Sequence, residues 1–220
     1  MKREVVPAIL AKSETEFREK LRAIERETKL VQIDVMDGEF VPNTTWADPL
    51  VVARMKTPAQ FEVHLMVKEP FREVILWGKL KNVRRTIVHA ESTKDLQTLL
   101  HTVRATGKEV GLAVNPSTRI WNLESGIWSA IDFVLVMANN PGFSGRPFRR
   151  ATLTRIATLR KRFPKLPIGV DIGVNLENAP LLRKAGATHI AAASTIFGQP
   201  NPVAAFRALR RAFHVQNKES

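Results

Sequence analysis

The sequence contains no cysteine. Disulfides, thiolate metal sites and a cysteine nucleophile are therefore excluded, and any metal ion has to be bound by histidine, carboxylate or neutral oxygen ligands. The sequence also has no apolar run long enough to span a bilayer, so we expect no membrane partner. Residues 1–4 lead directly into an apolar segment and lack the core of a signal peptide, which favours a cytoplasmic protein.

The chain is short of acidic residues relative to basic ones. Its 34 Lys and Arg exceed its 21 Asp and Glu, and the formal net charge is +13. Much of the excess lies in two segments expected to form amphipathic helices, residues 146–165 and 207–211. Such an excess can attract a phosphorylated substrate or nucleic acid, or it can be a solvated basic surface. No zinc finger, RNP-like strand or other nucleic-acid signature accompanies it, so we favour a solvated surface and expect no nucleic-acid partner.

Apolar strands and amphipathic helices alternate along the whole chain. The apolar segments predict strands at residues 5–10, 30–36, 60–67, 83–90, 110–114, 133–137, 168–172 and 189–193. Helical spacing or capping signals occur at residues 13–24, 46–55, 70–80, 92–107, 119–127, 146–165, 181–185 and 201–213. No linker or low-complexity tract interrupts this alternation, which predicts one domain over residues 1–220.

Most of these strands are continuously apolar, as strands buried on both faces are. Eight repeats of strand then helix predict a single closed (β/α)₈ TIM barrel. A doubly wound open sheet is the alternative. The turn after the first strand lacks a G-x-G-x-x-G fingerprint, which disfavours a dinucleotide-binding fold.

Three predicted strands carry a titratable residue at or near the end where barrel enzymes place their active groups: Asp34, His64 and Asp171. Asp34 and Asp171 belong to strands far apart in the order, so they could face each other across the barrel mouth. Two carboxylates on opposite sides of a small molecule suit removal of a proton from one face and its return to the other. A lone aspartate at a strand end more often caps a helix or fixes a loop, and we assign such a structural role to Asp37.

A lone histidine on an apolar strand is usually a core residue. His64 differs because it is grouped with the two aspartates, and histidine and carboxylates together can hold a divalent metal that polarises a carbonyl.

The glycine-rich turn NNPGFSG at residues 139–145 and the end of the last strand together predict a phosphate site. Glycines let backbone N–H groups approach an anion closely, and barrels often bind phosphate near the last two strands. A single glycine turn would be an ordinary loop, so the prediction depends on several such segments converging. The predicted substrate-binding and phosphate-binding residues are Met36, Met66, Met137, Gly142, Phe143, Ser144, Gly145, Gly173, Ala193 and Ser194. The three methionines are often simple core filler, but here they could surround a flat intermediate.

At these residues the chain resembles the ribulose-phosphate 3-epimerase family. The resemblance rests on PAIL at residues 7–10, DVMDGEFVPN at 34–43, HLMV at 64–67, NNPGFSG at 139–145, VDIGV at 170–174 and ASTIF at 193–197. These segments follow the family's order and cover nearly the whole chain. Each segment alone is modest evidence, but together they are highly specific.

The resemblance implies a metal-dependent isomerase of carbohydrate metabolism, in the pentose phosphate pathway. D-ribulose 5-phosphate would be converted to D-xylulose 5-phosphate by inversion at C3. One aspartate would remove the C3 proton, a metal would stabilise the enediolate, and the other aspartate would reprotonate the opposite face. The implied metal is Zn, Fe, Mn or Co. Its implied ligands are Asp34, His64 and Asp171, with Gln32 at the position of the family's first metal histidine.

Other positions also depart from the family pattern. Ala8 and Ala11 replace serines, Ile172 replaces a glycine after Asp171, and Ala193 replaces a glycine before Ser194. These departures leave two alternatives to a ribulose-phosphate epimerase. One is a non-catalytic barrel that binds a sugar phosphate, and the other is an epimerase of another ketose phosphate. The sequence also leaves a homo-oligomer open.

Overall fold

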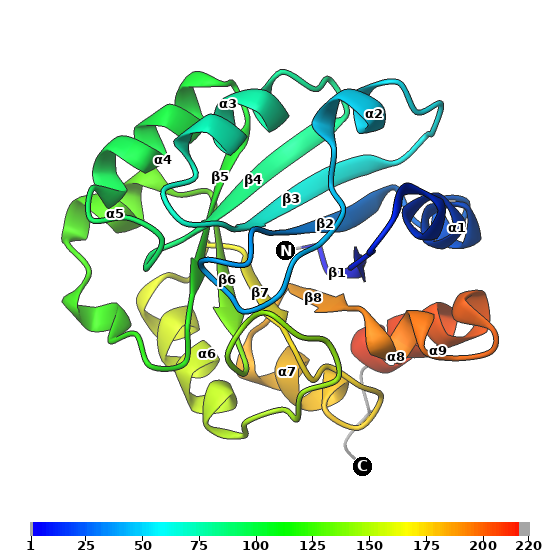
Figure 1. The fold of residues 1–220 in the computed structure, drawn as a ribbon. Coiled ribbons are helices and arrows are strands. Elements are labelled where there is room, and N and C mark those ends of the chain that lie inside the picture. Colours follow the sequence, from blue (N-terminus) through cyan, green and yellow to red (C-terminus); the bar gives the residue numbers. More distant parts are fainter. Residues whose placement is uncertain (1, 216–220) are drawn as a thin grey trace, which may run out of the picture.

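The computed structural model describes residues 2–215 and confirms the closed (β/α)₈ barrel (Figure 1). Each strand pairs in parallel with the next in sequence, and β8 closes the barrel onto β1. The strands are β1 (Glu4–Ile9), β2 (Leu30–Met36), β3 (Gln60–Met66), β4 (Val83–His89), β5 (Glu109–Val114), β6 (Phe133–Met137), β7 (Ile168–Asp171) and β8 (His189–Ala192). Every predicted strand is present, with ends shifted by at most one residue.

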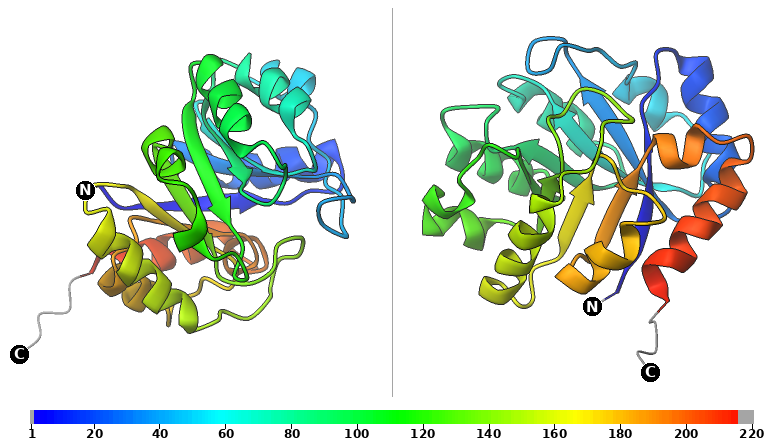
Figure 2. Two further views of the ribbon diagram at one scale, coloured as in Figure 1. Left: turned by 90° about the vertical axis from the view of Figure 1, so that its left-hand side faces the viewer. Right: turned by 90° about the horizontal axis from the view of Figure 1, so that it is seen from below.

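Helices surround the barrel on its outside (Figure 2). They are α1 (Glu14–Ile24), α2 (Pro49–Ala53), α3 (Phe71–Gly78), α4 (Leu96–Ala105), α5 (Ser125–Ala130), α6 (Ala151–Arg162), α7 (Ala179–Ala185), α8 (Ser194–Phe197) and α9 (Pro202–His214). Helix α9 packs against α1 and β1, so the last helix supports the first strand. Within the described part of the chain, no helix combines the length and apolar character needed to cross a membrane.

Several predicted helices are wrong in extent. The helix expected at residues 46–55 is only α2, because the side chain of Asp48 caps it and Pro49 disfavours helical backbone in the preceding residue. The helix expected at residues 119–127 is split into a 3₁₀ turn (Ile120–Asn122) and α5, with extended backbone at Leu123 between them. The helix expected at residues 146–165 is shorter, since α6 spans only Ala151–Arg162. The short helix α8 was not predicted.

The face of α3 that packs on the barrel also differs from the prediction. Helical spacing in the sequence predicts Val74, Ile75 and Leu80 on one apolar side of this helix, but Ile75 is 47% exposed. Trp77 is buried in its place, and Val74 is buried as expected. The sequence pattern favoured Ile75 because helical spacing alone does not show which edge of an apolar stripe meets the barrel.

Alternate residues of each strand face the helices or the barrel interior. On β2, Val31 and Ile33 belong to the large apolar core that also contains buried side chains of the helices. Gln32 and Asp34, between and after them, are buried polar residues. The continuous burial of β2 therefore conceals two different faces, an apolar face under the helices and a polar one inside the barrel.

A charged cluster closes the end of the barrel where the strands begin. The guanidinium of Arg85 donates to Glu62 Oε2 at 2.8 Å and to Glu109 Oε2 at 2.8 Å, and it stacks 3.8 Å from the centroid of the Phe133 ring. Phe133 reaches this position because Gly169 has no side chain, since a Cβ there would lie 2.3 Å from Phe133 Cζ. Arg85 and Glu62 are almost completely buried, so this charged cluster seals the floor of the barrel.

The pairing of β1 with β8 at this end predicts a pH-dependent contribution to stability. Glu4 Oε2 lies 2.8 Å from His189 Nε2, and this hydrogen bond lowers the pKa of Glu4 to about 2. Because the pKa of Glu4 in the folded protein is below its unfolded value, the contribution is complete above the ordinary pKa of 4.5 and is lost as the pH falls toward about 2. We expect Glu4→Gln to lower the free energy of unfolding by about 1–2 kcal/mol at pH 7.

Urea unfolding at pH 7 and pH 3 measures this effect, and the difference between wild type and Glu4→Gln should shrink by more than half at pH 3. Glu19→Gln, at an exposed position of α1, is the matched control and should change neither value. An equal deficit for Glu4→Gln at both pH values would contradict the assigned effect of the Glu4–His189 hydrogen bond.

Candidate active site

Strand register brings the predicted titratable residues together at the C-terminal mouth of the barrel. The pairing of β2 with β3 sets Asp34 beside His64 and, one layer nearer the mouth, Met36 beside Met66. The pairing of β6 with β7 sets Met137 beside Asp171. Barrel closure then brings β7 and β2 to the same cavity, although many residues separate them in the chain.

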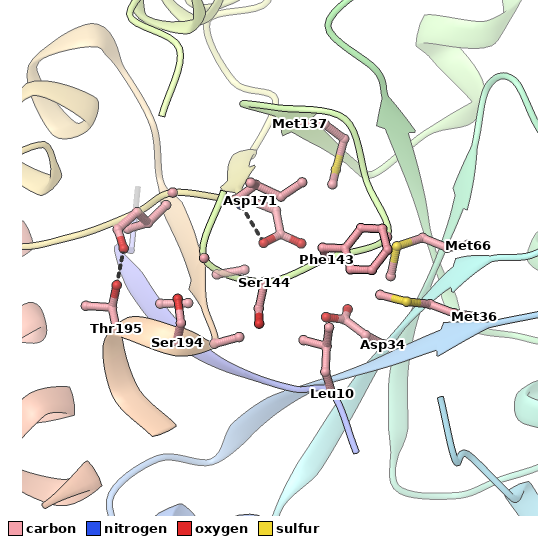
Figure 3. A pocket seen from close by; sticks show the side chains of 18 residues that line it. Leu10, Asp34, Met36, Met66, Met137, Phe143, Ser144, Asp171, Ser194 and Thr195 are labelled. Carbon is pink, nitrogen blue, oxygen red and sulfur yellow. Dashed lines mark hydrogen bonds between the residues drawn. The ribbon is translucent and has the colours of Figure 1, made fainter. Parts of the chain in front are cut away.

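The mouth holds a partly open cavity, whose empty space is about 420 Å³ when the solvent at its entrance is included, and Figure 3 shows it from close by. Asp34 and Asp171 reach into it between the methionines on one side and Ser144 and Ser194 on the other. The predicted site residues that line this cavity are Asp34, Met36, Met66, Met137, Gly142, Phe143, Ser144, Gly145, Asp171, Gly173, Ala193 and Ser194. The two remaining predicted residues, Gln32 and His64, are completely buried.

Two carboxylates, an imidazole and a carboxamide meet at the floor of this cavity. Possible ligand atoms of Asp34, His64 and Asp171 all lie within 4.8 Å of one another. Gln32 Nε2 donates to Asp34 Oδ1 at 2.8 Å and to Asp171 Oδ2 at 3.1 Å. His64 Nδ1 lies 3.1 Å and 3.5 Å from the same two oxygens. Burial raises the pKa of Asp171 to about 6, and the negative charge of Asp34 adds to this rise.

A relay of side chains behind His64 sets which of its nitrogens faces the carboxylates. His89 Nδ1 lies 3.3 Å from Glu91 Oε2, and His89 Nε2 lies 2.9 Å from His64 Nε2. Burial lowers the pKa of His89 to about 4, so its ring is neutral near pH 7. The Glu91 carboxylate can only accept a hydrogen bond, so the hydrogen of the neutral His89 ring is assigned to Nδ1. His89 Nε2 then has a lone pair and accepts a hydrogen bond from His64 Nε2–H.

This assignment leaves His64 Nδ1 directed at the two aspartates, either protonated or as a free lone pair. Burial acts to lower the pKa of His64, but the hydrogen bond to Asp34 and the charges of both aspartates outweigh it and raise the pKa. A metal ligand needs the lone pair, so the relay from Glu91 through His89 is the kind of outer support that metal-binding histidines have.

The donor set fits a divalent cation. Asp34, His64 and Asp171 are all buried and offer two carboxylates and one imidazole at close range. Gln32 Oε1 is a buried oxygen with no hydrogen-bond partner among the described residues. A cation at this point would reduce the repulsion between the two carboxylates, and it would become a partner of that oxygen once the carboxamide turned over.

His89 and Glu91 were missed by the sequence reasoning, although a signal was present. His89 ends β4 as a titratable residue, and the same argument that selected Asp34, His64 and Asp171 applies to it. Ile172, Leu10, Val174, Ala191, Ala192 and Thr195 also line the cavity beyond the predicted set.

The end of the cavity where the sequence predicts a phosphate site is built from backbone. The turn after β6 reaches the start of α8, so that a Cβ on Gly145 would lie 4.0 Å from Ser194 Oγ. Within residues 2–215, the backbone N–H groups of Gly145, Gly173 and Ser194 have no hydrogen-bond acceptor. Gly173 has φ +70°, and a Cβ there would lie 2.5 Å from the backbone nitrogen of Phe148. Only glycine fits at this position, and it leaves the backbone open to an anion.

Loops around the mouth are fixed by side-chain hydrogen bonds. Asn43 Nδ2 donates to the carbonyl of Gly142 at 2.8 Å, which ties the loop after β2 to the turn after β6. Asp37 accepts from the backbone N–H groups of Phe40 and Lys68 at 2.9 Å and 2.8 Å. As expected, Asp37 fixes a loop, and it does not line the cavity.

Ile172 has a strained backbone next to Asp171. Its φ is +75°, a left-handed conformation that β-branched residues rarely adopt. Such a conformation costs about 1–3 kcal/mol and is found mainly at functional sites. The Ile172 side chain lines the cavity and packs against the inner cluster that contains Met137. The side chain that replaces the family's glycine at this position therefore lines the site.

A closed (β/α)₈ barrel with acid–base groups gathered at its C-terminal mouth defines the class of this protein as a barrel enzyme that acts on a small molecule. The chain belongs to the ribulose-phosphate 3-epimerase family, because the family model described as "Ribulose-phosphate 3 epimerase family" matches residues 4–197. The resemblance that the sequence motifs indicated is thereby confirmed.

Individual relatives agree with this membership. The chain is 33% identical over 215 residues to the ribulose-phosphate 3-epimerase of Bacillus subtilis (strain 168), covering 94% of this chain and 98% of that protein. It is 34% identical over 193 residues to the ribulose-phosphate 3-epimerase, cytoplasmic isoform, of Oryza sativa subsp. japonica, covering 86% and 84%. Among solved structures, 3-hexulose-6-phosphate synthase from Salmonella typhimurium has a TM-score of 0.73 at 13% identity, covering 97% and 98%. This last likeness shows the fold alone.

The relay predicts that His89 acts on metal binding through His64. His89→Phe keeps an aromatic ring but removes the acceptor for His64 Nε2–H, so we expect divalent metal affinity to fall by about 10- to 100-fold. Competition with a chromophoric chelator measures the affinity, and circular dichroism checks the fold. His101→Phe, the same change at an exposed position of α4, should leave the affinity unchanged. Unchanged affinity in His89→Phe would show that the relay does not orient His64.

Proposed function

We propose that the chain catalyses the interconversion of D-ribulose 5-phosphate and D-xylulose 5-phosphate by moving a proton off and onto C3. The observation that carries this proposal is the meeting of Asp34 and Asp171 at the floor of one cavity, with ligand atoms within 4.8 Å of each other and of His64. Family membership and the relatives' names support the same reaction.

The two aspartates act as the acid–base pair. They come from β2 and β7, which β1 and β8 separate around the barrel, and both reach into the cavity, so a ketose bound there presents a different face of C3 to each. One carboxylate removes the C3 proton, which leaves a planar enediolate, and the other carboxylic acid delivers a proton to the opposite face. The roles exchange for the reverse reaction.

Asp34, His64 and Asp171 are the residues that would hold a divalent metal, with Gln32 as the neighbouring fourth group. When bound, such an ion supplies Lewis-acid polarisation of the ketose at C2. Zn, Fe, Mn and Co are the metals that the family resemblance implies.

The remaining lining residues hold the substrate and keep out water. Met36 and Met66 form an apolar cluster with Val41 on one side of the mouth, and Met137 lies on the inner wall. Polarizable thioethers of this kind can pack against a flat enediolate. On the other side, the free backbone N–H groups at Gly145, Gly173 and Ser194 suit the phosphate.

The proposal extends to the setting of the enzyme. Residues 1–220 form one domain, the site takes a phosphorylated ketose, and the enzyme acts in the cytoplasm in the pentose phosphate pathway. The alternation of elements without a linker supports the single domain. The cytoplasmic isoform among the relatives is consistent with the compartment.

Proton exchange at C3 tests the acid–base assignment. In D₂O, wild-type enzyme should incorporate deuterium and invert C3 together. Asp34→Asn and Asp171→Asn each leave one base, so each variant should still exchange the C3 proton of one epimer while inversion falls by about 10²- to 10⁴-fold. Mass spectrometry of deuterium uptake and an epimer assay, run with added Mn²⁺, Zn²⁺ or Fe²⁺, measure the two processes separately.

Asp95→Asn is the matched control, because asparagine can still cap α4 and this cap lies outside the cavity lining. It should keep wild-type exchange and inversion. A non-catalytic sugar-phosphate-binding barrel remains the second candidate, since Gln32 already satisfies both carboxylates. Absence of exchange with every metal, together with thermal stabilisation by ribulose 5-phosphate, would select that candidate.

The phosphate assignment predicts a charge effect at Ser194. Ser194→Asp places a negative charge among the free N–H groups, at the first residue of α8 where an acidic side chain suits the helix. We expect KM for the ketose phosphate to rise by about tenfold or more and the thermal stabilisation by inorganic phosphate to disappear. Ser125→Asp, at the first residue of α5, is the control and should retain both. Phosphate stabilisation that persists in Ser194→Asp would place the anion elsewhere.

A further inference from the structure

The carboxamide of Gln32 occupies a position between two buried carboxylates. Its Nε2 donates one hydrogen to Asp34 and the other to Asp171, at 2.8 Å and 3.1 Å, so both amide hydrogens are used. The Gln32 side chain is completely buried. Its Oε1 has no hydrogen-bond partner among the described residues, which leaves one end of the group satisfied and the other end not.

A half-turn of the carboxamide exchanges these two ends. Oxygen and nitrogen of a glutamine amide have nearly the same size and position, so the turn about the last side-chain bond moves no other atom. The turn would direct Oε1 at two negatively charged oxygens, which is unfavourable unless a cation lies between them. Gln32 therefore has two arrangements. Its N–H groups neutralise the carboxylates when no cation is present, and its carbonyl oxygen joins them when a cation is bound.

The bound arrangement has a particular donor chemistry. Gln32 would supply a neutral oxygen, Asp34 and Asp171 carboxylate oxygens, and His64 one nitrogen. Oxygen ligands suit Mn²⁺ and Mg²⁺, whereas imidazole favours zinc and other later transition metals. A histidine at position 32 would instead supply a second nitrogen.

We propose that Gln32 is a metal-selecting residue whose carboxamide turns over on metal binding and shifts the preference of the site from Zn²⁺ toward Mn²⁺. The inference rests on the proposed function, because it names the metal preference of the same site. The proposal also gives a physical reason for the unpaired Oε1, because this oxygen becomes a metal ligand after the carboxamide turns over.

Metal binding without substrate tests the selection. The affinity for Mn²⁺ follows from the loss of the electron paramagnetic resonance signal of free Mn²⁺, and the affinity for Zn²⁺ from competition with a chromophoric chelator. The ratio Kd(Mn²⁺)/Kd(Zn²⁺) should be at least about tenfold larger in Gln32→His than in wild type. Gln32→Leu keeps the bulk but removes the carbonyl, and it should weaken Mn²⁺ binding by about tenfold or more.

Equal ratios in wild type and Gln32→His would overturn the selection. So would Mn²⁺ affinity in Gln32→Leu that equals wild type. Circular dichroism of each variant checks that the comparison is made on folded protein. Gln97→Leu, at an exposed position of α4, is the matched control and should leave both affinities unchanged.

Side-chain amide resonances test the turning of the carboxamide. In protein labelled with ¹⁵N-glutamine, the Nε2 resonances of Gln32 are identified by their loss in Gln32→Leu. Both amide protons should shift upfield on saturation with Mg²⁺, a diamagnetic stand-in for Mn²⁺, because they leave their carboxylate acceptors. The Gln97 resonances should not move. Unshifted Gln32 resonances at saturating Mg²⁺ would show that the amide does not turn and would overturn this part of the proposal.

These measurements separate the two proposals. C3 exchange in a protein whose metal ratio does not respond to Gln32→His would refute the metal selection and leave the epimerase assignment standing. A ratio that responds as expected in a protein that never exchanges C3 would support the metal selection and refute the epimerase assignment.

Discussion

The active end of this barrel depends on holding two carboxylates close together and away from water. Asp34 and Asp171 are brought to one cavity by the closure of β7 and β8 onto β1 and β2. Like charges at this distance repel strongly in a buried setting, so the arrangement is stable only if proton donors or a cation lie between them. Gln32 supplies two such donors and His64 supplies another when its Nδ1 is protonated, which explains why the inner face of β2 and β3 is polar at this level.

Holding the two carboxylates together also places a requirement on β4, the strand beside β3. His64 can serve the carboxylates only if its other nitrogen has a suitable partner, and His89 provides one. Glu91 then determines which nitrogen of His89 carries the hydrogen. The chemistry at the cavity floor is thus determined by residues on β2, β3, β4 and β7 and in the loop after β4. The end of the cavity proposed to bind phosphate, in contrast, is built from backbone N–H groups and needs little from any side chain.

Much of this could be predicted from the sequence because a barrel converts strand order into position. The eight strands, Asp34, His64, Asp171 and the turn after β6 follow from apolar spacing and from the rule that active groups lie at strand ends. Side-chain direction could not be obtained in that way. The contact of Gln32 with both aspartates and the His64–His89 pair depend on the register between particular strands, and the left-handed backbone of Ile172 on local packing. The short α2 depends on its Asp48 cap, and the unexpected α8 has no side-chain cap but contacts the loop after β7 through Thr195.

The buried ion cluster around Arg85 affects how small molecules reach the active site. Arg85, Glu62 and Phe133 fill the far end of the barrel, and the cavity that holds Asp34 and Asp171 opens at the C-terminal mouth. Sugar, solvent and any ion that reach this cavity from the mouth pass the rim that bears the methionines and the glycine turn. A group that occupies that rim therefore blocks exit from the cavity, and the time for which a reactive enediolate stays in the site depends on this rim.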